Sequence, residues 1–334
     1  MSKDKFIDTE KLALQEWLKL VYKPPKDKLF MRRSFPSDKH RDEYIATIQS
    51  RPHNEVQKLL HAFLMHSTSL DVWDELNFEH LNYAHQSDKE RFEQMSSHTY
   101  YRRLANYFKV SKEIYPWEGN TWILDLLPHS PKIALEGLNA YIFAHIPVLP
   151  DKALQGLFDA AEIIRAKYIG LPGTQKDRTR MLLDLSPRQF EQLTERLYNG
   201  MDYDTYLTPP SRDGGRDVIA KINDGAKHEF LLIECKRYAD MVDVGIIREF
   251  YGVLVSEKAN RGVLVTSGRF SPDARKFAKN NSMQLINGEQ FVLLLNEHLG
   301  NNWPQKLDRI LAESEKHYQN QMVATNKTRK RYVK

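Results

Sequence analysis

Apolar residues recur at helical spacing throughout the first half of the chain. Leu14, Trp17, Leu18 and Val21 repeat every three or four positions, and apolar residues at positions 56, 59, 60, 63 and 64 do the same. This spacing places them along one face of a helix, which buries that face against other elements. Strand-like alternation is scarce up to Gly170. The pattern predicts an all-helical N-terminal domain over residues 1–172.

Two later helices of this domain have recognisable ends. Ser130-Pro131 places an N-cap residue before proline at the first helical position, which is a typical helix start. The buried face of that helix is predicted to contain Ile133, Leu135, Leu138, Ile142 and Phe143. A last helix is predicted from about residue 151 to residue 168, ending at Gly170.

A polar stretch with proline and glycine follows, Leu-Pro-Gly-Thr-Gln-Lys-Asp-Arg-Thr-Arg at 171–180. It has no hydrophobic periodicity, and Pro-Gly pairs are typical of loops. We therefore expect an interdomain linker at residues 173–183.

The pattern changes after the linker to alternating helices and strands. Ser186-Pro187-Arg188-Gln189 is a capping box that opens a helix. Strands are predicted at 217–222 and 229–236 as a hairpin, and at 262–266 and 283–286. Helices are predicted at 243–257, after Ser271, and at 289–298. This order predicts an α/β domain over residues 184–299, with helices packed on a mixed central sheet. A C-terminal helix and basic tail are expected at 300–334.

Composition and charge add three points. The 334 residues, 41% apolar, suffice for two domains with their own cores. Residues 300–334 contain eight Lys/Arg and three Asp/Glu, which accounts for the whole net charge of +5. The basic tail (Lys327, Arg329, Lys330, Arg331, Lys334) either contacts phosphates or is a solvated terminus.

Localisation is expected to be cytoplasmic. The single cysteine, Cys235, has no partner for an internal disulfide, and residues 1–5 have mixed charges without an apolar signal region. The longest apolar stretch, 141–149, is interrupted by His145 and Pro147 and is far shorter than the roughly 20 residues of a membrane helix. No membrane association is expected.

Three charged residues of the hairpin share one surface. Alternation along the second strand points Glu234 and Lys236 to the same face and Cys235 to the other. If residues 222 and 229 flank a six-residue loop, then positions whose numbers sum to 451 pair, and Asp217 lies opposite Glu234. Charges within so apolar a strand carry a desolvation penalty unless they are paired or bind a metal.

This arrangement has two interpretations. Neighbouring carboxylates repel, and a hard cation such as Mg²⁺ relieves the repulsion while leaving positions for water and phosphate. Lys236 would then orient or help deprotonate the attacking water, or neutralise charge on the phosphate oxygens. An isolated Glu-x-Lys on a strand is otherwise an ion pair that stabilises the sheet only slightly.

Neighbouring motifs favour the first interpretation. Asp213-Gly-Gly-Arg-Asp217, Ile233-Glu-Cys-Lys-Arg-Tyr238, Glu249-Phe-Tyr-Gly252 and Val265-Thr-Ser-Gly268 follow one another along the chain. In sequence and spacing they closely resemble the Mrr-type restriction endonuclease domain of the PD-(D/E)xK nuclease superfamily. The resemblance covers about residues 184–297 and implies a restriction-endonuclease-like fold.

The resemblance also implies roles for particular residues. Asp217 and Glu234 would hold the metal, Lys236 would be the catalytic lysine, and Glu191 on the first helix matches an acidic position that often completes the metal site. Many family members have Gln where this chain has Glu234, and glutamate keeps the acidic ligand set complete. The cofactor is expected to be Mg²⁺, with Mn²⁺ as a substitute.

The glycines and arginines around the site have expected roles of their own. Gly214-Gly215 would let the chain pass close to a phosphate and aim Asp217 inward. Arg212, Arg216 and Arg237 flank the site and are candidates for contacts to the DNA backbone.

These features predict a Mg²⁺-dependent endonuclease that hydrolyses DNA, with a role in restriction or anti-phage defence and modified DNA as a candidate target. A dimer or higher homo-oligomer would allow both strands to be cut. The alternatives are a repair or junction-resolving nuclease and a DNA-binding protein that keeps the fold without cutting. The N-terminal domain would choose the target, sense a signal or form the oligomer.

Several other polar and aromatic positions are interpreted as structural. His61 and His66 are five residues apart, unlike the spacing of four that places two zinc ligands on one helical face. They are taken as ordinary helical residues. Trp117 and Trp122 are expected to anchor the helical domain.

Overall fold

A computed structural model of the chain describes residues 6–66, 72–98, 100–102, 104–105, 119–210, 215–224 and 227–332. The chain divides into two compact units, Met1–Gly170 (unit 1) and Leu171–Lys334 (unit 2). In the described ranges, no helix combines the length and apolar character needed to cross a membrane.

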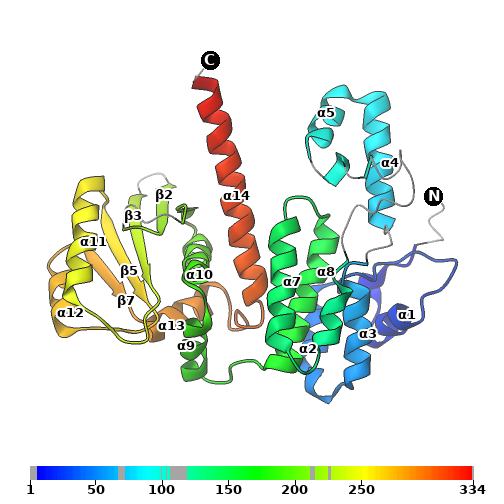
Figure 1. The fold of residues 1–334 in the computed structure, drawn as a ribbon, viewed down its shortest axis with the longest axis horizontal. Coiled ribbons are helices and arrows are strands. Elements are labelled where there is room, and N and C mark those ends of the chain that lie inside the picture. The colour runs from blue at the N-terminus through cyan, green and yellow to red at the C-terminus, as the bar shows by residue number, and fades with distance from the viewer. Residues whose placement is uncertain are drawn as a thin grey trace. The chain divides into compact units, whose positions relative to one another are not determined.

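The described part of unit 1 contains helices and no strand, as predicted (Figure 1). Its elements are the 3-10 helices η2 (Thr9–Lys11), η3 (Ile48–Ser50) and η4 (Thr121–Leu126), the α-helices α1 (Leu14–Tyr22), α2 (Asp38–Ala46), α3 (His53–Phe63), α4 (Val72–Ser87), α5 (Lys89–Ser97), α7 (Pro131–His145) and α8 (Asp151–Ile164), and the π-helix η5 (Arg165–Ile169).

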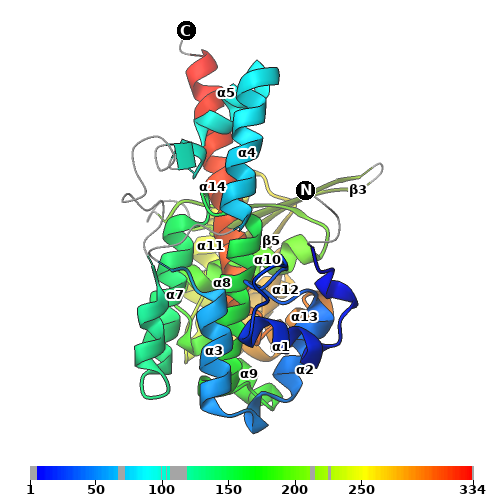
Figure 2. The same ribbon diagram turned by 90° about the vertical axis from the view of Figure 1, so that its right-hand side faces the viewer.

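The core of unit 1 forms around α8, which packs against α3 and α7 (Figures 1 and 2). The predicted apolar faces of α1 and α3 are buried. Trp17, Phe35 and Phe63 form an aromatic cluster with ring centroids 5.1–6.2 Å apart. Polar contacts lie inside the same core, where the Arg41 guanidinium is 3.2 Å from the fully buried Glu162 carboxylate.

Two expectations for unit 1 are wrong. Ile133, assigned to the buried face of α7, is 58% exposed, because the helix packs on one side only. Trp122 is 52% exposed and covers Gly137 from outside rather than anchoring the core. Trp117 lies outside the described residues.

Residues 173–183, predicted to be a linker, instead contain most of helix α9 (Gln175–Asp184) in unit 2. Thr174 accepts a hydrogen bond from the Asp177 amide, and the Asp177 side chain accepts from the Thr174 amide, so the helix start is capped. The helix packs on α13 (Gly288–His298) and buries only Leu182, which is why it shows no hydrophobic periodicity.

Unit 2 is built on a mixed sheet, as predicted, and the sheet has five strands. The strands are β1 (Asp204–Leu207), β2 (Val218–Asp224), β3 (Lys227–Lys236), β5 (Arg261–Thr266) and β7 (Met283–Ile286), in the order β1-β2-β3-β5-β7. β1, β2 and β3 are antiparallel neighbours, whereas β3, β5 and β7 run parallel. Two short strands, β4 (Met241–Val242) and β6 (Arg269–Phe270), pair separately. The short strands β1, β4 and β6 were not predicted.

The predicted register of the hairpin is confirmed. Val218 pairs with Ile233, so paired positions sum to 451, and residue 217 lies at the level of Glu234. Pairing continues to Asp224 and Lys227, which makes the connection shorter than the six-residue loop expected from the sequence.

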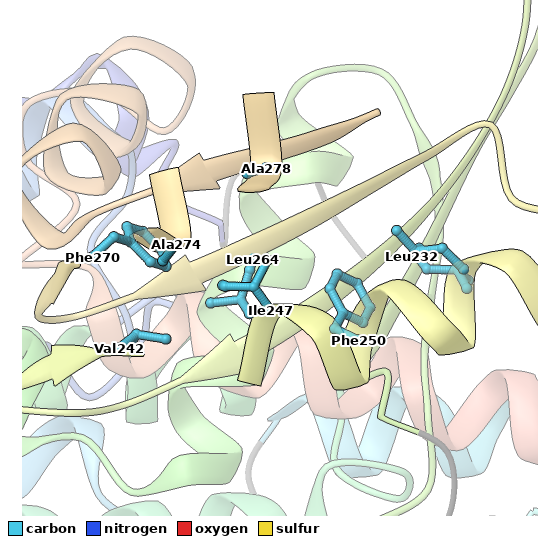
Figure 3. Close-up of a cluster of buried hydrophobic side chains, with 9 residues drawn as sticks. Leu232, Val242, Ile247, Phe250, Leu264, Phe270, Ala274 and Ala278 are labelled. Atoms are coloured by element: carbon cyan, nitrogen blue, oxygen red, sulfur yellow. The ribbon is translucent and has the colours of Figure 1, made fainter. Parts of the chain in front are cut away.

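Helices cover both faces of the sheet. On one face, α11 (Val244–Glu257) and α12 (Pro272–Lys279) bury Leu232, Ile247, Phe250 and Leu264 (Figure 3). On the other face lie α10 (Pro187–Gly200) and α13, which contact through the Phe190 and Phe291 rings. The C-terminal helix α14 (Leu307–Tyr332) packs on α10 and β1.

A buried carboxylate joins α14 to the sheet. Glu195 of α10 is fully buried and accepts hydrogen bonds from the Thr205 hydroxyl of β1 and from His317 Nδ1 of α14. Gln321 of α14 donates to the Thr205 carbonyl at 2.7 Å. The C-terminal helix is therefore an integral part of unit 2, fixed to α10 at its middle.

Gly156 and Gly252 test the packing of their helices, because Gly156 is tightly surrounded and Gly252 is not. A Cβ at Gly156 in α8 would lie 1.8 Å from the Arg33 carbonyl oxygen, whereas nothing lies within 4 Å of one at Gly252 in α11. We expect Gly156→Ala to lower the free energy of unfolding of unit 1 by about 1–3 kcal/mol. Gly252→Ala should raise that of unit 2 by about 0.5–1 kcal/mol. Calorimetric unfolding measures both, and equal signs would contradict the packing described for α8.

Candidate active site

Asp217 is fixed where β2 begins, between β1 and β3. Its amide donates to the Ile233 carbonyl at 2.9 Å, and its own carbonyl accepts from the Thr208 amide at 2.9 Å. The side chain reaches across the hairpin, where Oδ2 accepts from the Cys235 amide at 2.7 Å. The carboxylate therefore lies beside the backbone that joins Glu234 to Lys236.

Glu234 and Lys236 lie together at the end of β3, as predicted. Lys236 Nζ is 2.6 Å from Glu234 Oε1, and the Glu234 side chain is only 8% exposed. Its second oxygen, Oε2, is buried and has no hydrogen-bond partner. Cys235 points to the opposite face, toward Thr194 of α10. Half of the Glu234 carboxylate is thus buried without a partner.

Glu191 of α10 approaches the same site from the other face of the sheet. Arg188 Nη1 donates to Glu191 Oε2 at 2.9 Å and to the Thr208 carbonyl at 2.8 Å. Burial raises the pKa of Glu191, and the charge of Asp217 raises it further, while Arg188 and Lys236 oppose this rise. Glu191 is therefore electrostatically coupled to Asp217 and Lys236.

Arg188 is a site residue that the sequence analysis missed. It connects Glu191 on α10 to Thr208, whose amide and hydroxyl both donate to the Asp217 carbonyl. Its only sequence signal is the spacing of three from Glu191, which many surface ion pairs share.

Burial dominates the electrostatics of the carboxylates. Burial raises the pKa of Asp217, against the hydrogen bond from the Cys235 amide and the charge of Lys236. Burial also raises the pKa of Glu234, against its bond to Lys236, and the charge of Asp217 adds to the rise. For Lys236, burial lowers the pKa, but Glu234 and Asp217 together raise it above its ordinary value. Lys236 is therefore an ammonium group at neutral pH.

The donor set fits a hard divalent cation. Asp217, Glu234 and Glu191 offer carboxylate oxygens, one of them the unpartnered Glu234 Oε2, and an added positive charge would stabilise all three in ionised form. Among the described residues no three His, Cys, Asp or Glu side chains form a ready-made metal cage. Mg²⁺ suits such a site, because it is usually held by one or two carboxylates and completed by water and phosphate.

The three arginines singled out in the sequence differ in their surroundings. Arg212 lies outside the described residues. Arg216 forms an ion pair with Glu257 of α11 and is partly exposed. Arg237 donates from Nη1 to the Leu183 carbonyl at 2.8 Å, and its Nε is buried without a partner. Arg237 thus fixes the end of α9 to the end of β3. Gly215 has a φ of 57°, a conformation that favours glycine, whereas Gly214 is not described.

A cavity of about 1170 Å³ opens beside the ends of β3 and β5. Ser267 and Gly268, directly after β5, form part of its wall, and α9 forms another part with Lys176 and Arg180. Arg269 is the third cation of the lining and lies 3.7 Å from Glu289, and the lining also contains the acidic residues Asp177 and Asp240. This surface was not predicted from the sequence, because α9 was assigned to a linker.

Comparisons with known proteins find similarity to restriction endonucleases. Residues 182–295 match the family model Mrr_cat, restriction endonuclease. The chain is 34% identical over 123 residues to the type IV methyl-directed restriction enzyme EcoKMrr of Escherichia coli strain K12, which is 35% of this chain and 40% of that enzyme. The chain thus spans less than half the length of this relative.

Among solved structures, the DNA modification-dependent restriction endonuclease AspBHI is similar at 24% identity and a TM-score of 0.35 over 43% of this chain and 41% of that one. The MspJI restriction endonuclease, in complex with a 27-mer oligonucleotide, is similar at 21% identity and a TM-score of 0.32, over 50% and 46% respectively.

The raised pKa of Asp217 gives a stability test. A carboxyl group whose pKa is higher in the folded than in the unfolded protein lowers the free energy of unfolding as the pH rises from the unfolded pKa to the folded pKa. For Asp217 this pH range begins at the ordinary value of 3.8. Asp217→Asn removes the charge and keeps an oxygen for the Cys235 amide. We expect this variant to unfold at a higher temperature than the wild type at pH 7 and at nearly the same temperature near pH 3. A lower melting temperature at pH 7 would contradict the assigned burial.

Proposed function

We propose that this chain is a metal-dependent endonuclease that hydrolyses phosphodiester bonds of DNA, since residues 182–295 match the restriction endonuclease family model. The observation that carries the proposal is the buried, unpartnered Oε2 of Glu234, next to Asp217 and to an ammonium group. A carboxylate buried in this way costs stability unless a ligand uses it. Such a site is better explained by cation binding than by an ion pair that stabilises the sheet.

The residues divide into three roles. Asp217 and Glu234 would hold Mg²⁺, or Mn²⁺ in its place, and Glu191 would act as a further carboxylate from α10. When bound, the ion supplies positive charge to the phosphate oxygens and acidifies water. Lys236, next to Glu234, would orient or help deprotonate the attacking water, or neutralise charge on the phosphate oxygens.

The α9 side of the cavity described above offers two cations for contact with the DNA backbone. Lys176 and Arg180 lie there next to Asp177, with which both interact. We assign phosphate contacts to them and to Arg216, while Arg237 has a structural role in holding α9. Such contacts supply affinity and position the DNA without reading its sequence.

The proposed biological role is restriction or anti-phage defence in the cytoplasm, with modified DNA as the substrate and a homodimer as the cutting form. The methyl-directed action named for EcoKMrr supports the choice of substrate. A repair or junction-resolving nuclease is the second candidate, since the same site would cut branched DNA. A protein that binds DNA without cutting is the third, and the complete set of Asp217, Glu234 and Lys236 speaks against it.

Plasmid cleavage tests the catalytic assignment. Purified full-length chain is incubated with plasmid DNA carrying methylated bases and with unmethylated plasmid, with Mg²⁺ or with EDTA. We expect cleavage that requires Mg²⁺ and falls at least about 10²-fold in Asp217→Ala and in Lys236→Ala, since each removes charge from the site. Preference for the methylated plasmid would support modified DNA as substrate, whereas cutting confined to branched DNA would support the second candidate.

Lys279→Ala is the matched control for Lys236→Ala, because Lys279 is an exposed lysine in the last turn of α12. It should cleave like the wild type. Equal cleavage by the wild type and both active-site variants would show that another protein causes the activity. Mg²⁺ should also raise the melting temperature of the wild type more than that of Asp217→Ala, which tests metal binding without any DNA.

Arg188 is proposed to position Glu191 and the Asp217 segment. Arg188→Gln should raise the Mg²⁺ concentration needed for half-maximal cleavage by about 10–100-fold, as loss of a residue that orients metal ligands does. Arg188→Lys should recover part of the effect, and Arg196→Gln, on the same helix but paired with Glu313, should have none. If Arg188→Gln lowers cleavage at saturating Mg²⁺ and leaves the Mg²⁺ requirement unchanged, then Arg188 does not act through the metal ligands.

A further inference from the structure

Unit 1 contains a cavity that the nuclease site does not involve. It has a volume of about 750 Å³ and is bordered by the C-terminal end of α1, the segment after it, α3 and η4. Its polar and charged lining residues are Tyr22, Arg32, Arg33, Asn54, Gln57, Lys58, His61, His66 and Asp125, and Val21, Ala62 and Leu124 provide apolar wall. We call this cavity the unit 1 pocket.

The lining is unbalanced in charge. Arg32, Arg33 and Lys58 are cations, and Asp125 is the one acidic residue among those that line the pocket. Arg32 and Lys58 are exposed side chains that make no ion pair with any described carboxylate. Two histidines add further positive charge whenever they are protonated. Like charges such as those of Arg32 and Lys58 repel one another, and a bound anion relieves that repulsion.

The position of Arg33 is fixed by the core of the unit. A Cβ added at Gly156 of α8 would lie only 1.8 Å from the Arg33 carbonyl oxygen. Only glycine at that position therefore allows the Arg33 segment to pack so close to α8. The residue is 7% exposed, and its Nη1 donates to Met65 Sδ at 3.5 Å, a weak acceptor. The backbone of Arg33 is thus fixed by its packing against α8, and its guanidinium lies next to Met65.

The two histidines of the pocket lie in a positive electrostatic environment. The His61 and His66 rings lie 4.4 Å apart between centroids, and His66 Nε2 contacts the His61 carbonyl at 2.8 Å. Burial lowers the pKa of His66, and the charges of His61, Arg33 and Arg32 lower it further against that contact. Several positive groups therefore act on one point of the pocket.

We propose that the unit 1 pocket binds a phosphorylated small molecule of nucleotide size, with its phosphates on Arg32, Arg33 and Lys58. Guanidinium groups bind phosphate oxygens through paired hydrogen bonds, and an ammonium adds a point charge. The volume lies within the ~300–1,000 Å³ of typical small-molecule sites. Tyr22, the histidine pair and Leu124 offer flat and apolar surface for a ring of the ligand. The proposal does not depend on the nuclease assignment, since it concerns other residues in another unit.

Isothermal titration of the full-length chain tests the proposal, in EDTA so that metal binding at Asp217 and Glu234 plays no part. The probes are ATP, pyrophosphate and adenosine. We expect ATP and pyrophosphate to bind and adenosine to bind at least tenfold more weakly than ATP. Arg32→Gln/Lys58→Gln should weaken ATP and pyrophosphate at least tenfold. Lys39→Gln/Lys152→Gln removes the same charge from exposed positions outside the pocket and should bind like the wild type.

Other results would overturn the proposal. Failure of both ATP and pyrophosphate to bind, or equal affinity in the two double variants, would show that the pocket is not a phosphate site. Binding of a single-stranded oligonucleotide without binding of either small probe would assign the cations to nucleic acid instead. Lys236→Ala should bind ATP like the wild type, and a loss there would place the binding in unit 2. Equal melting temperatures of the two double variants exclude unfolding as the cause.

Discussion

The antiparallel pairing of β2 with β3 is the constraint on which the candidate active site depends. With Val218 opposite Ile233, residue 217 comes to the level of Glu234, and its carboxylate reaches the Cys235 amide at 2.7 Å. A shift of one residue would turn every side chain of the strand to the other face of the sheet. The parallel pairing of β3 with β5 places Lys236 opposite Thr266, whose hydroxyl donates to the Lys236 carbonyl at 2.7 Å. The apolar core beneath α11 and α12 therefore holds the charged residues in place.

Bringing these charged side chains together in a buried site lowers the free energy of unfolding, and interactions with neighbouring residues offset that loss only in part. Burial raises the pKa of Asp217, Glu234 and Glu191, so each is destabilising when ionised. Lys236 and Arg188 each stabilise one carboxylate directly, and Glu234 Oε2 is left buried without a partner. Functional sites commonly retain such unfavourable groups, because a ligand that supplies the missing charge gains binding free energy from them.

The helices α9 and α14 extend unit 2 beyond its sheet. Arg237 joins the end of β3 to Leu183 at the end of α9, and Glu195 joins α10 to His317 of α14. Both connections reach the helix or strand that carries a site residue, since Glu191 lies on α10 and Lys236 on β3. Arg188 also contacts α14, where its guanidinium lies 4.8 Å from the centre of the Tyr318 ring. The position of Glu191 is thus set by elements distant in sequence.

Several elements and the central part of the predicted site could be inferred from the amino-acid sequence. Helical spacing identified α1 and α3, alternation placed Glu234 and Lys236 on one face, and the hairpin register followed from the expected limits of its two strands, because these features depend on local periodicity. Sequence periodicity did not reveal α9, which buries one leucine, or the short strands β1, β4 and β6, which are recognised only by their pairing partners. Only the tertiary structure brought Arg188 between Glu191 and Thr208, occupied Arg216 and Arg237 with protein partners, and left Glu234 Oε2 unpaired. Those outcomes depend on which residues distant in sequence come into contact and on how far their side chains are removed from solvent. Neither can be inferred from the spacing of residues along the chain.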